Sequence, residues 1–130
     1  MKLLRRLLVC LMPMGAMVHA EATQWSYLSG ERDLSYAVDT DSVATDADGY
    51  IEYIGKTTWK VPEKVQGAAQ PVAISLTRYQ IDCGHKRWRA VDTHYLAADG
   101  TPAGFVHPTS PEWTAIGPGT VVDIMFRKVC

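Results

Sequence analysis

The chain has 130 residues, of which 47% are hydrophobic and 21% are charged, and its formal net charge at pH 7 is -1. This length suits one domain that is large enough to bury a hydrophobic core. The composition excludes a strongly basic nucleic-acid-binding protein, a low-complexity chain and a repeat protein.

Residues 1–20 have the pattern of a secretory signal peptide. Three basic residues precede an apolar run at 7–18, and Ala20 is a small residue where a signal peptidase cleaves, with Ala22 as a second cleavage point. The apolar run is too short for a membrane span, which needs about 20 residues. The sequence therefore predicts a signal peptide over 1–20 and one exported domain over 21–130, in the periplasm or at the cell surface, without a membrane span.

The exported domain is acidic. Cleavage removes three of the thirteen basic residues and no acidic residue, which leaves ten Lys and Arg against fourteen Asp and Glu. An acidic exported domain is a poor nucleic-acid binder, so nucleic acid is excluded as a partner.

The cysteines predict one disulfide. Cys10 leaves with the signal peptide, and it follows Val9, where a lipid-anchored cysteine would need a small residue. Cys83 and Cys130 remain, and two cysteines in an oxidising compartment are expected to pair. Their bridge would close a long loop and stabilise the fold by about 4 kcal/mol on the chain-entropy model.

Alternating polar and apolar residues predict three strands in the first half of the domain, at 25–28, 34–39 and 50–61. The sequence Asp-Ala-Asp-Gly at 46–49 indicates a turn before the third strand. Two prolines and a glycine then predict a loop at 62–71.

A β-hairpin is the clearest prediction in the second half. Its strands run over 73–83 and 85–96, with Cys83-Gly84 as the turn, so Tyr79 is expected opposite Trp88. One face is then a core face, with Tyr79, Ile81, Trp88 and Ala90. The other is a solvated basic face, with Arg78, Gln80, Asp82, His85, Arg87 and Arg89.

The C-terminal part is less regular. Prolines and glycines at 99–118 predict an irregular connection with a short edge strand at 104–107. The last segment, 120–130, alternates like a strand, but Thr120 and Asp123 form a helix-capping pair. An apolar stripe with helical spacing follows, so we predict a helix with Val122, Met125, Phe126, Val129 and Cys130 on the sheet.

The basic face of the hairpin is the candidate binding surface. Arg78, His85, Arg87 and Arg89 surround the densest cationic run of the chain. Basic side chains next to an aromatic residue bind acidic protein surfaces or anionic glycans, the two partner classes that export leaves open. The alternative is a merely solvated face whose Trp88 points into the core.

Catalysis and metal binding have little support in the sequence. Cys83 and His85 are zinc-ligand types, but the disulfide explains Cys83 more simply. The acidic stretch 39–48 lacks the ligand series of an EF-hand loop. No serine-hydrolase elbow, zinc-protease helix or phosphate loop occurs. We therefore expect no enzyme, no cofactor and no metal site.

The order of several residues resembles the surface-adhesin protein E-like family of Gram-negative bacteria. The residues that carry the resemblance are Trp25, Tyr36, Asp39, Ser42, Val43, Trp59, Tyr79, Asp82, Cys83, Tyr95, Gly100, Pro118, Gly119 and Cys130. They extend over nearly the whole exported domain.

The resemblance implies an α+β fold, in which an antiparallel sheet of about six strands carries one C-terminal α-helix, here stapled by the disulfide. It also implies a non-enzymatic domain that binds host matrix or plasma proteins such as vitronectin and laminin. The namesake adhesin is lipid-anchored, but Val9 before Cys10 makes this cysteine unsuitable for lipid attachment, so we expect no such anchor here. The alternative function is that of a soluble periplasmic envelope protein or hydrolase inhibitor without adhesin activity.

Overall fold

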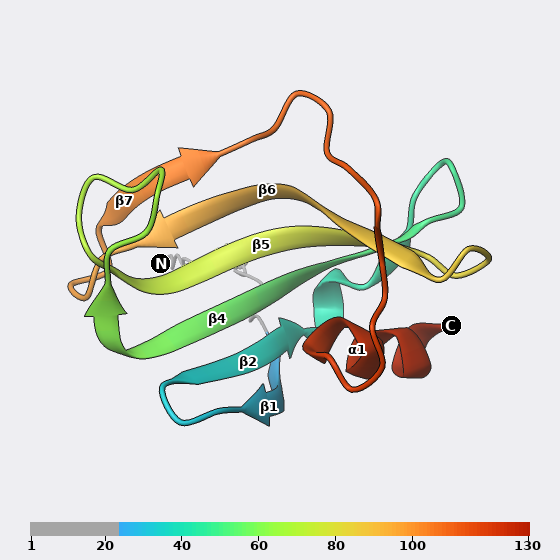
Figure 1. The fold of residues 1–130 in the computed structure, drawn as a ribbon, viewed down its shortest axis with the longest axis horizontal. Helices are drawn as coiled ribbons and strands as arrows, with labels where there is room; N and C mark the ends of the chain where they lie inside the picture. Colours follow the sequence, from blue (N-terminus) through green and yellow to red (C-terminus); the bar gives the residue numbers. More distant parts are fainter. Residues whose placement is uncertain (1–23) are drawn as a thin grey trace, which may run out of the picture.

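The computed structural model describes residues 24–130, so the predicted signal peptide and Cys10 lie outside the described residues. The chain forms one antiparallel sheet with a helix over one end (Figure 1). The long strands lie in the order β1-β2-β4-β5-β6-β7. They are β1 Trp25–Gly30, β2 Leu34–Asp39, β4 Ile51–Glu63, β5 Val72–Asp82, β6 Arg87–Leu96 and β7 Pro102–Val106. The expected α+β fold is confirmed.

The remaining elements are short. The 3-10 helix η1 at Thr40–Ser42 leads into β3 at Ala44–Thr45, which pairs with the start of β4. Strand β8, Thr114–Ala115, pairs with Arg87 and Trp88 of β6, while β7 pairs with the other half of the same edge of β6. The C-terminal helix α1 is Val121–Val129. No helix among residues 24–130 is long and apolar enough to cross a membrane.

Strand β4 is longer than predicted. It continues through Pro62 to Glu63, where the sequence predicted the start of a loop. The pairing of β4 with β5 is irregular between Thr58 and Glu63, so Pro62 lies in a part of the strand that lacks regular pairing. A proline is tolerated there because it has no N–H to donate to the ladder.

The predicted register of the β5–β6 hairpin is wrong by two residues. Trp88 lies opposite Ile81 rather than Tyr79, because the turn has four residues, Cys83 to Lys86, instead of two. The side chain of Asp82 accepts a hydrogen bond from the backbone N–H of His85 at 3.3 Å and so supports this wider turn. A shift of two residues keeps every side chain on its face, so the predicted core and basic faces are retained.

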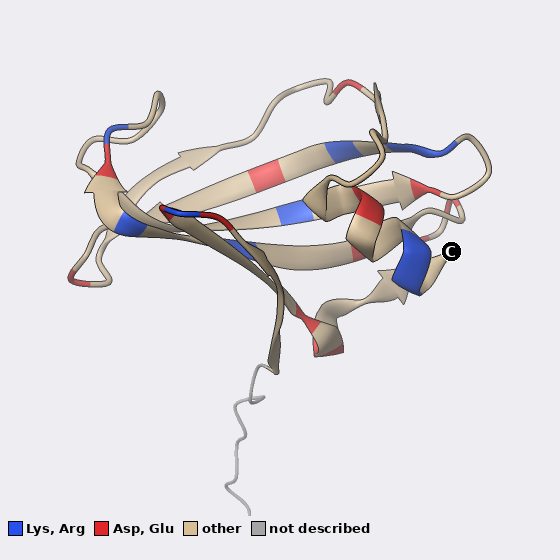
Figure 2. Cartoon of the chain, turned by 60° about the horizontal axis from the view of Figure 1, so that its bottom comes forward, with Lys and Arg blue, Asp and Glu red and all other residues tan. Residues whose placement is uncertain are grey.

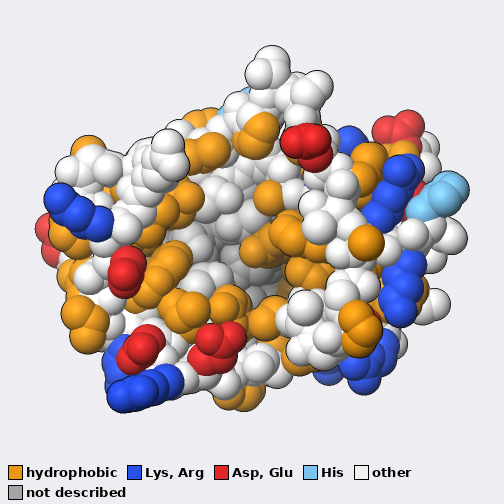
Figure 3. Space-filling view, viewed as in Figure 1, with side chains coloured by type: hydrophobic (Ala, Val, Ile, Leu, Met, Phe, Trp, Pro, Cys, Tyr) orange, Lys and Arg blue, Asp and Glu red, His pale blue; other side chains and the backbone are white. Residues whose placement is uncertain are grey.

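Two apolar clusters lie at opposite ends of the strands. The first is under α1 and contains Val38, Tyr53, Ile81, Ile116 and Met125, with Trp88 packed against it. The second contains Val72, Ala97 and Ala103, with Val65 and Ala68 of the β4–β5 loop packed on it. Figure 3 shows that the surface of the sheet is hollowed between these two ends.

The helix prediction at the C-terminus is confirmed. The hydroxyl of Thr120 accepts a hydrogen bond from the N–H of Asp123 at 3.2 Å and caps the helix. Asp123 in turn accepts the N–H of Gly119 at 2.9 Å. A disulfide joins Cys130, at the end of α1, to Cys83 at the end of β5, with 5.6 Å between their Cα atoms. The predicted staple is therefore present.

Candidate functional site

The basic face of the hairpin is built as a set of cross-strand pairs. Arg87 lies opposite Asp82, Arg89 opposite Gln80, and Arg78 opposite Asp92. Each arginine donates to the residue that it faces, and Arg78 also lies 3.9 Å from Glu52. The three arginines therefore lie on one face of the hairpin, and each already donates a hydrogen bond within the sheet.

Trp113 covers part of this face. The guanidinium carbons of Arg87 and Arg89 lie 4.6 Å and 4.2 Å from the centre of the Trp113 ring. Tyr50 meets the same ring edge-on, with 4.9 Å between the ring centres. Cation–π contacts of this kind stabilise a packed arginine. The face that was predicted as solvated is therefore partly covered by Trp113.

Gln80 connects the arginines to acidic residues of two other segments. Its carbonyl oxygen accepts a hydrogen bond from Arg89 at 2.7 Å. Its amide nitrogen donates to Asp46 at 2.9 Å and to Glu52 at 3.0 Å. Gln80 is 9% exposed, and a buried polar side chain with all these partners holds its surroundings in one arrangement. Arg78 and Arg89 are thus anchored inside a polar network.

His85 and Arg87 lie near the tip of the hairpin and share the carboxylate of Asp82. The ring Nδ1 of His85 and the Nε of Arg87 each lie 2.9 Å from its Oδ2. Burial raises the pKa of Asp82, but the hydrogen bonds from Arg87 and His85 outweigh it, so the pKa lies below its ordinary value. Asp82 therefore stays ionised and holds both side chains beside the turn.

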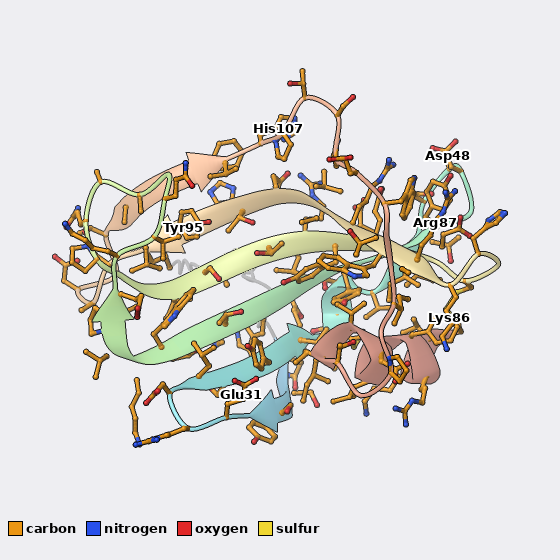
Figure 4. The ribbon with its side chains drawn as sticks, viewed as in Figure 1. Glu31, Asp48, Lys86, Arg87, Tyr95 and His107 are labelled. Atoms are coloured by element: carbon orange, nitrogen blue, oxygen red, sulfur yellow. A yellow bond between two sulfur atoms is a disulfide. The ribbon has the colours of Figure 1, made fainter. Side chains whose placement is uncertain are left out.

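The disulfide places a second basic segment beside the hairpin tip. Arg127 and Lys128 are in the last turn of α1, close to Cys130. The ammonium group of Lys86 lies 5.4 Å from the ring centre of Phe126, which confirms that the turn and the helix end meet. We call the set His85, Lys86, Arg87, Arg127 and Lys128 the basic end. Figure 2 shows the Lys and Arg of both segments at the same end of the molecule, and Figure 4 labels Lys86 and Arg87 there.

The cations of the hairpin and the helix end differ in exposure. The side chains of His85 and Arg127 are 73% and 65% exposed, whereas those of Arg78 and Arg87 are 43% and 34% exposed. Lys86 and Lys128 are also exposed. A partner can therefore reach His85 and Arg127 more easily than Arg78 or Arg87.

The candidate binding residues predicted from the sequence leave out four contributors to this surface. Lys86 belongs to the predicted cationic run, but it lies in the turn, with a left-handed φ of 48°, and so has no place on a strand face. Arg127 and Lys128 could have been found from the predicted disulfide, since it joins the helix end to the hairpin. Trp113 had no such signal, because it lies in an irregular connection.

The alternative of a metal site at the hairpin is excluded for Cys83, whose sulfur is bonded to Cys130. Within residues 24–130, no group of three or more His, Cys, Asp and Glu is placed to hold a metal ion.

The fold has a known counterpart. The structure of Haemophilus influenzae protein E matches 88% of this chain and 90% of its own, with a TM-score of 0.55 and 11% sequence identity. At this identity the match shows a shared fold only. No curated protein sequence matches the chain.

The family assignment comes from the sequence. The family model described as surface-adhesin protein E matches residues 25–130, which is the whole described domain except its first residue. This family match indicates an adhesin-like domain. The chain therefore belongs to the surface-adhesin protein E family.

Proposed function

We propose that this domain binds host matrix or plasma proteins and that an acidic segment of the partner docks on the basic end. Family and fold support an adhesin-like domain that is exported or exposed at the surface. The proposal adds the class of partner, the contact surface and a role outside the cell, with a signal peptide over 1–20 as the means of export.

The observation that carries this proposal is the clustering of cations on an acidic chain. Four Lys and Arg residues come from the β5–β6 hairpin and from the last turn of α1, two segments that the Cys83–Cys130 disulfide joins. His85 lies on the same hairpin, beside Arg87. Asp82 and Asp123 neutralise only part of this charge, through Arg87 and Arg127. A basic patch on an otherwise acidic surface attracts an acidic partner and orients it during encounter.

The test is a double substitution of the two exposed lysines, Lys86→Asn and Lys128→Ser. Asparagine is chosen at 86 because it tolerates a left-handed backbone. Binding to vitronectin or laminin, measured by surface plasmon resonance, should weaken about fivefold or more and depend less steeply on salt. Stability should change by less than about 0.5 kcal/mol, since both side chains are exposed.

The matched control is Lys60→Ser with Lys64→Ser. These exposed lysines lie at the far end of β4 and in the loop after it, and the control changes the net charge by the same amount. It should leave binding unchanged. An equal loss of affinity in both double variants would mean that only the net charge matters. Unchanged affinity in the test variant would show that the partner does not bind at the basic end.

A further inference from the structure

The open face of the sheet carries a row of hydroxyl side chains between its two apolar clusters. Tyr36 of β2 lies opposite Thr57 of β4, Thr57 opposite Ser75 of β5, and Ser75 opposite Tyr95 of β6. Four neighbouring strands thus each contribute one hydroxyl at the same level. In the next row Thr77 lies opposite Thr93, and their hydroxyl oxygens are 2.9 Å apart. We call these six residues the hydroxyl floor.

The floor is polar, although two of its residues are buried and the other four are half-buried. Ser75 and Thr77 are 6% and 7% exposed. Apolar residues are the usual occupants of such positions, because burying a hydroxyl costs free energy unless it is hydrogen-bonded. The hydrogen bond with Thr93 offsets this cost for Thr77, and the polarity of the row as a whole makes it a candidate surface for a polar ligand.

The floor is also uncharged. Burial raises the pKa of the nearby Tyr79, and the hydrogen bond between the Thr77 hydroxyl and the Tyr79 phenol opposes this only in part. Burial and the charge of Glu31 likewise raise the pKa of Tyr36. Both phenols stay neutral at physiological pH, so they add hydrogen-bonding groups without adding charge.

Other segments of the chain stand above the sheet on both sides of the floor, so the floor forms the bottom of a hollow. On one side a pocket is lined by Tyr36, Gly55 and Thr57 of the sheet together with Val121 and Val122 of α1. On the other side the β4–β5 loop packs onto β7, where a Cβ atom on Gly104 would lie 2.5 Å from the carbonyl oxygen of Gly67. Figure 3 shows this hollow, and Figure 4 labels Tyr95 at its end beside that loop.

We propose that the hollow binds a neutral carbohydrate chain. A hydroxyl group both donates and accepts, so a row of hydroxyls can pair with sugar hydroxyls, which do the same. The rings of Tyr36 and Tyr95 add apolar surface for the carbon face of a sugar, in keeping with the mixture of aromatic and polar groups that lines ligand sites. The proposal is independent of the basic end and extends the function of the domain to a second ligand class.

Other occupants fit this surface less well. An acidic segment would be repelled by Glu31, whose charge acts on Tyr36, and a basic segment would lose its hydration over a floor that has no charge of its own. An acyl chain would give the hydroxyls of Tyr36, Thr57 and Tyr95 no partner, although Thr77 and Thr93 bond to each other. A sugar chain meets none of these penalties.

The experiment is a titration followed by NMR, with lacto-N-tetraose as a host-type glycan and chitotetraose as an N-acetylated strand of the cell-wall type. Amide signals of the floor residues should shift with at least one of the two sugars, and the affinity should stay constant up to about 0.5 M salt. The variant Thr57→Val with Tyr95→Phe removes two hydroxyls and keeps the shapes. It should weaken binding about tenfold.

Thr58→Val is the matched control, because Thr58 is the next residue of β4 and points to the opposite face of the sheet. It should bind like the wild type. The variant of Lys86 and Lys128 should also keep sugar binding, which separates this proposal from the basic end. No shift at the floor with either sugar, or equal affinity after removal of both hydroxyls, would overturn the proposal.

Discussion

Asp123 shows how one buried carboxylate joins several parts of the fold. It is 4% exposed, and it accepts hydrogen bonds from the N–H of Gly119 at 2.9 Å and from Arg127 at 2.6 Å. The hydrogen bonds from Arg127 and Gly119 lower its pKa, and the charges of Arg127 and Lys86 add to this against the opposing effect of burial. The residue therefore holds the start of α1 and orients a cation of the basic end.

We expect Asp123→Asn to lower the free energy of unfolding at neutral pH. We also expect this free energy to fall less steeply in acid than it does in the wild type. The pKa of Asp123 lies below its ordinary value of 3.8, so the unfolded chain binds more protons between the two values. The stabilisation is complete above about pH 4 and is lost as the pH falls through the folded-state pKa. Thermal unfolding followed by circular dichroism from about pH 7 to pH 2 measures this.

Asp48→Asn is the control, since Asp48 lies exposed in the turn before β4. This variant should keep the wild-type profile. If Asp123→Asn lost stability in acid as steeply as the wild type does, the hydrogen bonds of Asp123 would not stabilise the folded state.

Sequence reasoning succeeds at single residues where the interaction is local. The capping of α1 by Thr120 was predictable because it joins residues three positions apart. The contact of Trp113 with Arg87 was not, because a flexible connection of unknown path separates them. The anchoring of Arg89 by Gln80 needed the register, which the sequence did not determine.

At the level of elements, the packing of α1 rests on Met125 more than on Phe126. Both belong to the predicted stripe, but Met125 is 2% exposed and lies in the core cluster, whereas Phe126 is half-buried at its border. The helix is therefore oriented so that Met125, rather than Phe126, points most directly into the core. Apolar spacing predicts which residues share a face, but it does not determine which of them lies deepest.

Met125→Ala should cost about 2 to 5 kcal/mol of unfolding free energy, the range for a fully buried side chain. Phe126→Ala should cost less, because part of its surface already faces water. Urea unfolding of the two variants gives both free energies. The opposite ranking, or no change in either, would mean that the helix packs in another orientation.

The β5–β6 hairpin shows what alternation can and cannot predict. Period-two alternation assigned Trp88 to the core and Arg87 to the basic face, and both assignments are confirmed. The turn length was not predictable, because it depends on the bonding of Asp82 to His85 and on the left-handed backbone of Lys86.

At the scale of the whole molecule, the family resemblance predicted the fold, whereas the shape of its open face needed coordinates. The hydroxyls of Thr57, Ser75 and Tyr95 are far apart in the sequence, and only the pairing of three strands puts them in one row. Their individual residue types are ordinary in strands, so no sequence pattern indicated a common surface. The same holds for the approach of Gly67 to Gly104, which closes one end of the hollow.

The bridge between Cys83 and Cys130 constrains the molecule as a whole. It joins residues 47 positions apart and so restricts the unfolded chain over more than a third of its length. The variant with serine at both positions should lose about 4 kcal/mol of unfolding free energy on the chain-entropy model. Urea unfolding with and without a reductant measures the effect.

The reductant provides the internal control for this last prediction. It should lower the stability of the wild type towards that of Cys83→Ser with Cys130→Ser and leave the double variant unchanged. Binding at the basic end should weaken in the double variant, because Arg127 and Lys128 lose their tether to the hairpin. Equal stability and binding with and without the bridge would mean that Met125 and its neighbours alone hold α1 on the sheet, and that the two basic segments stay together without the disulfide.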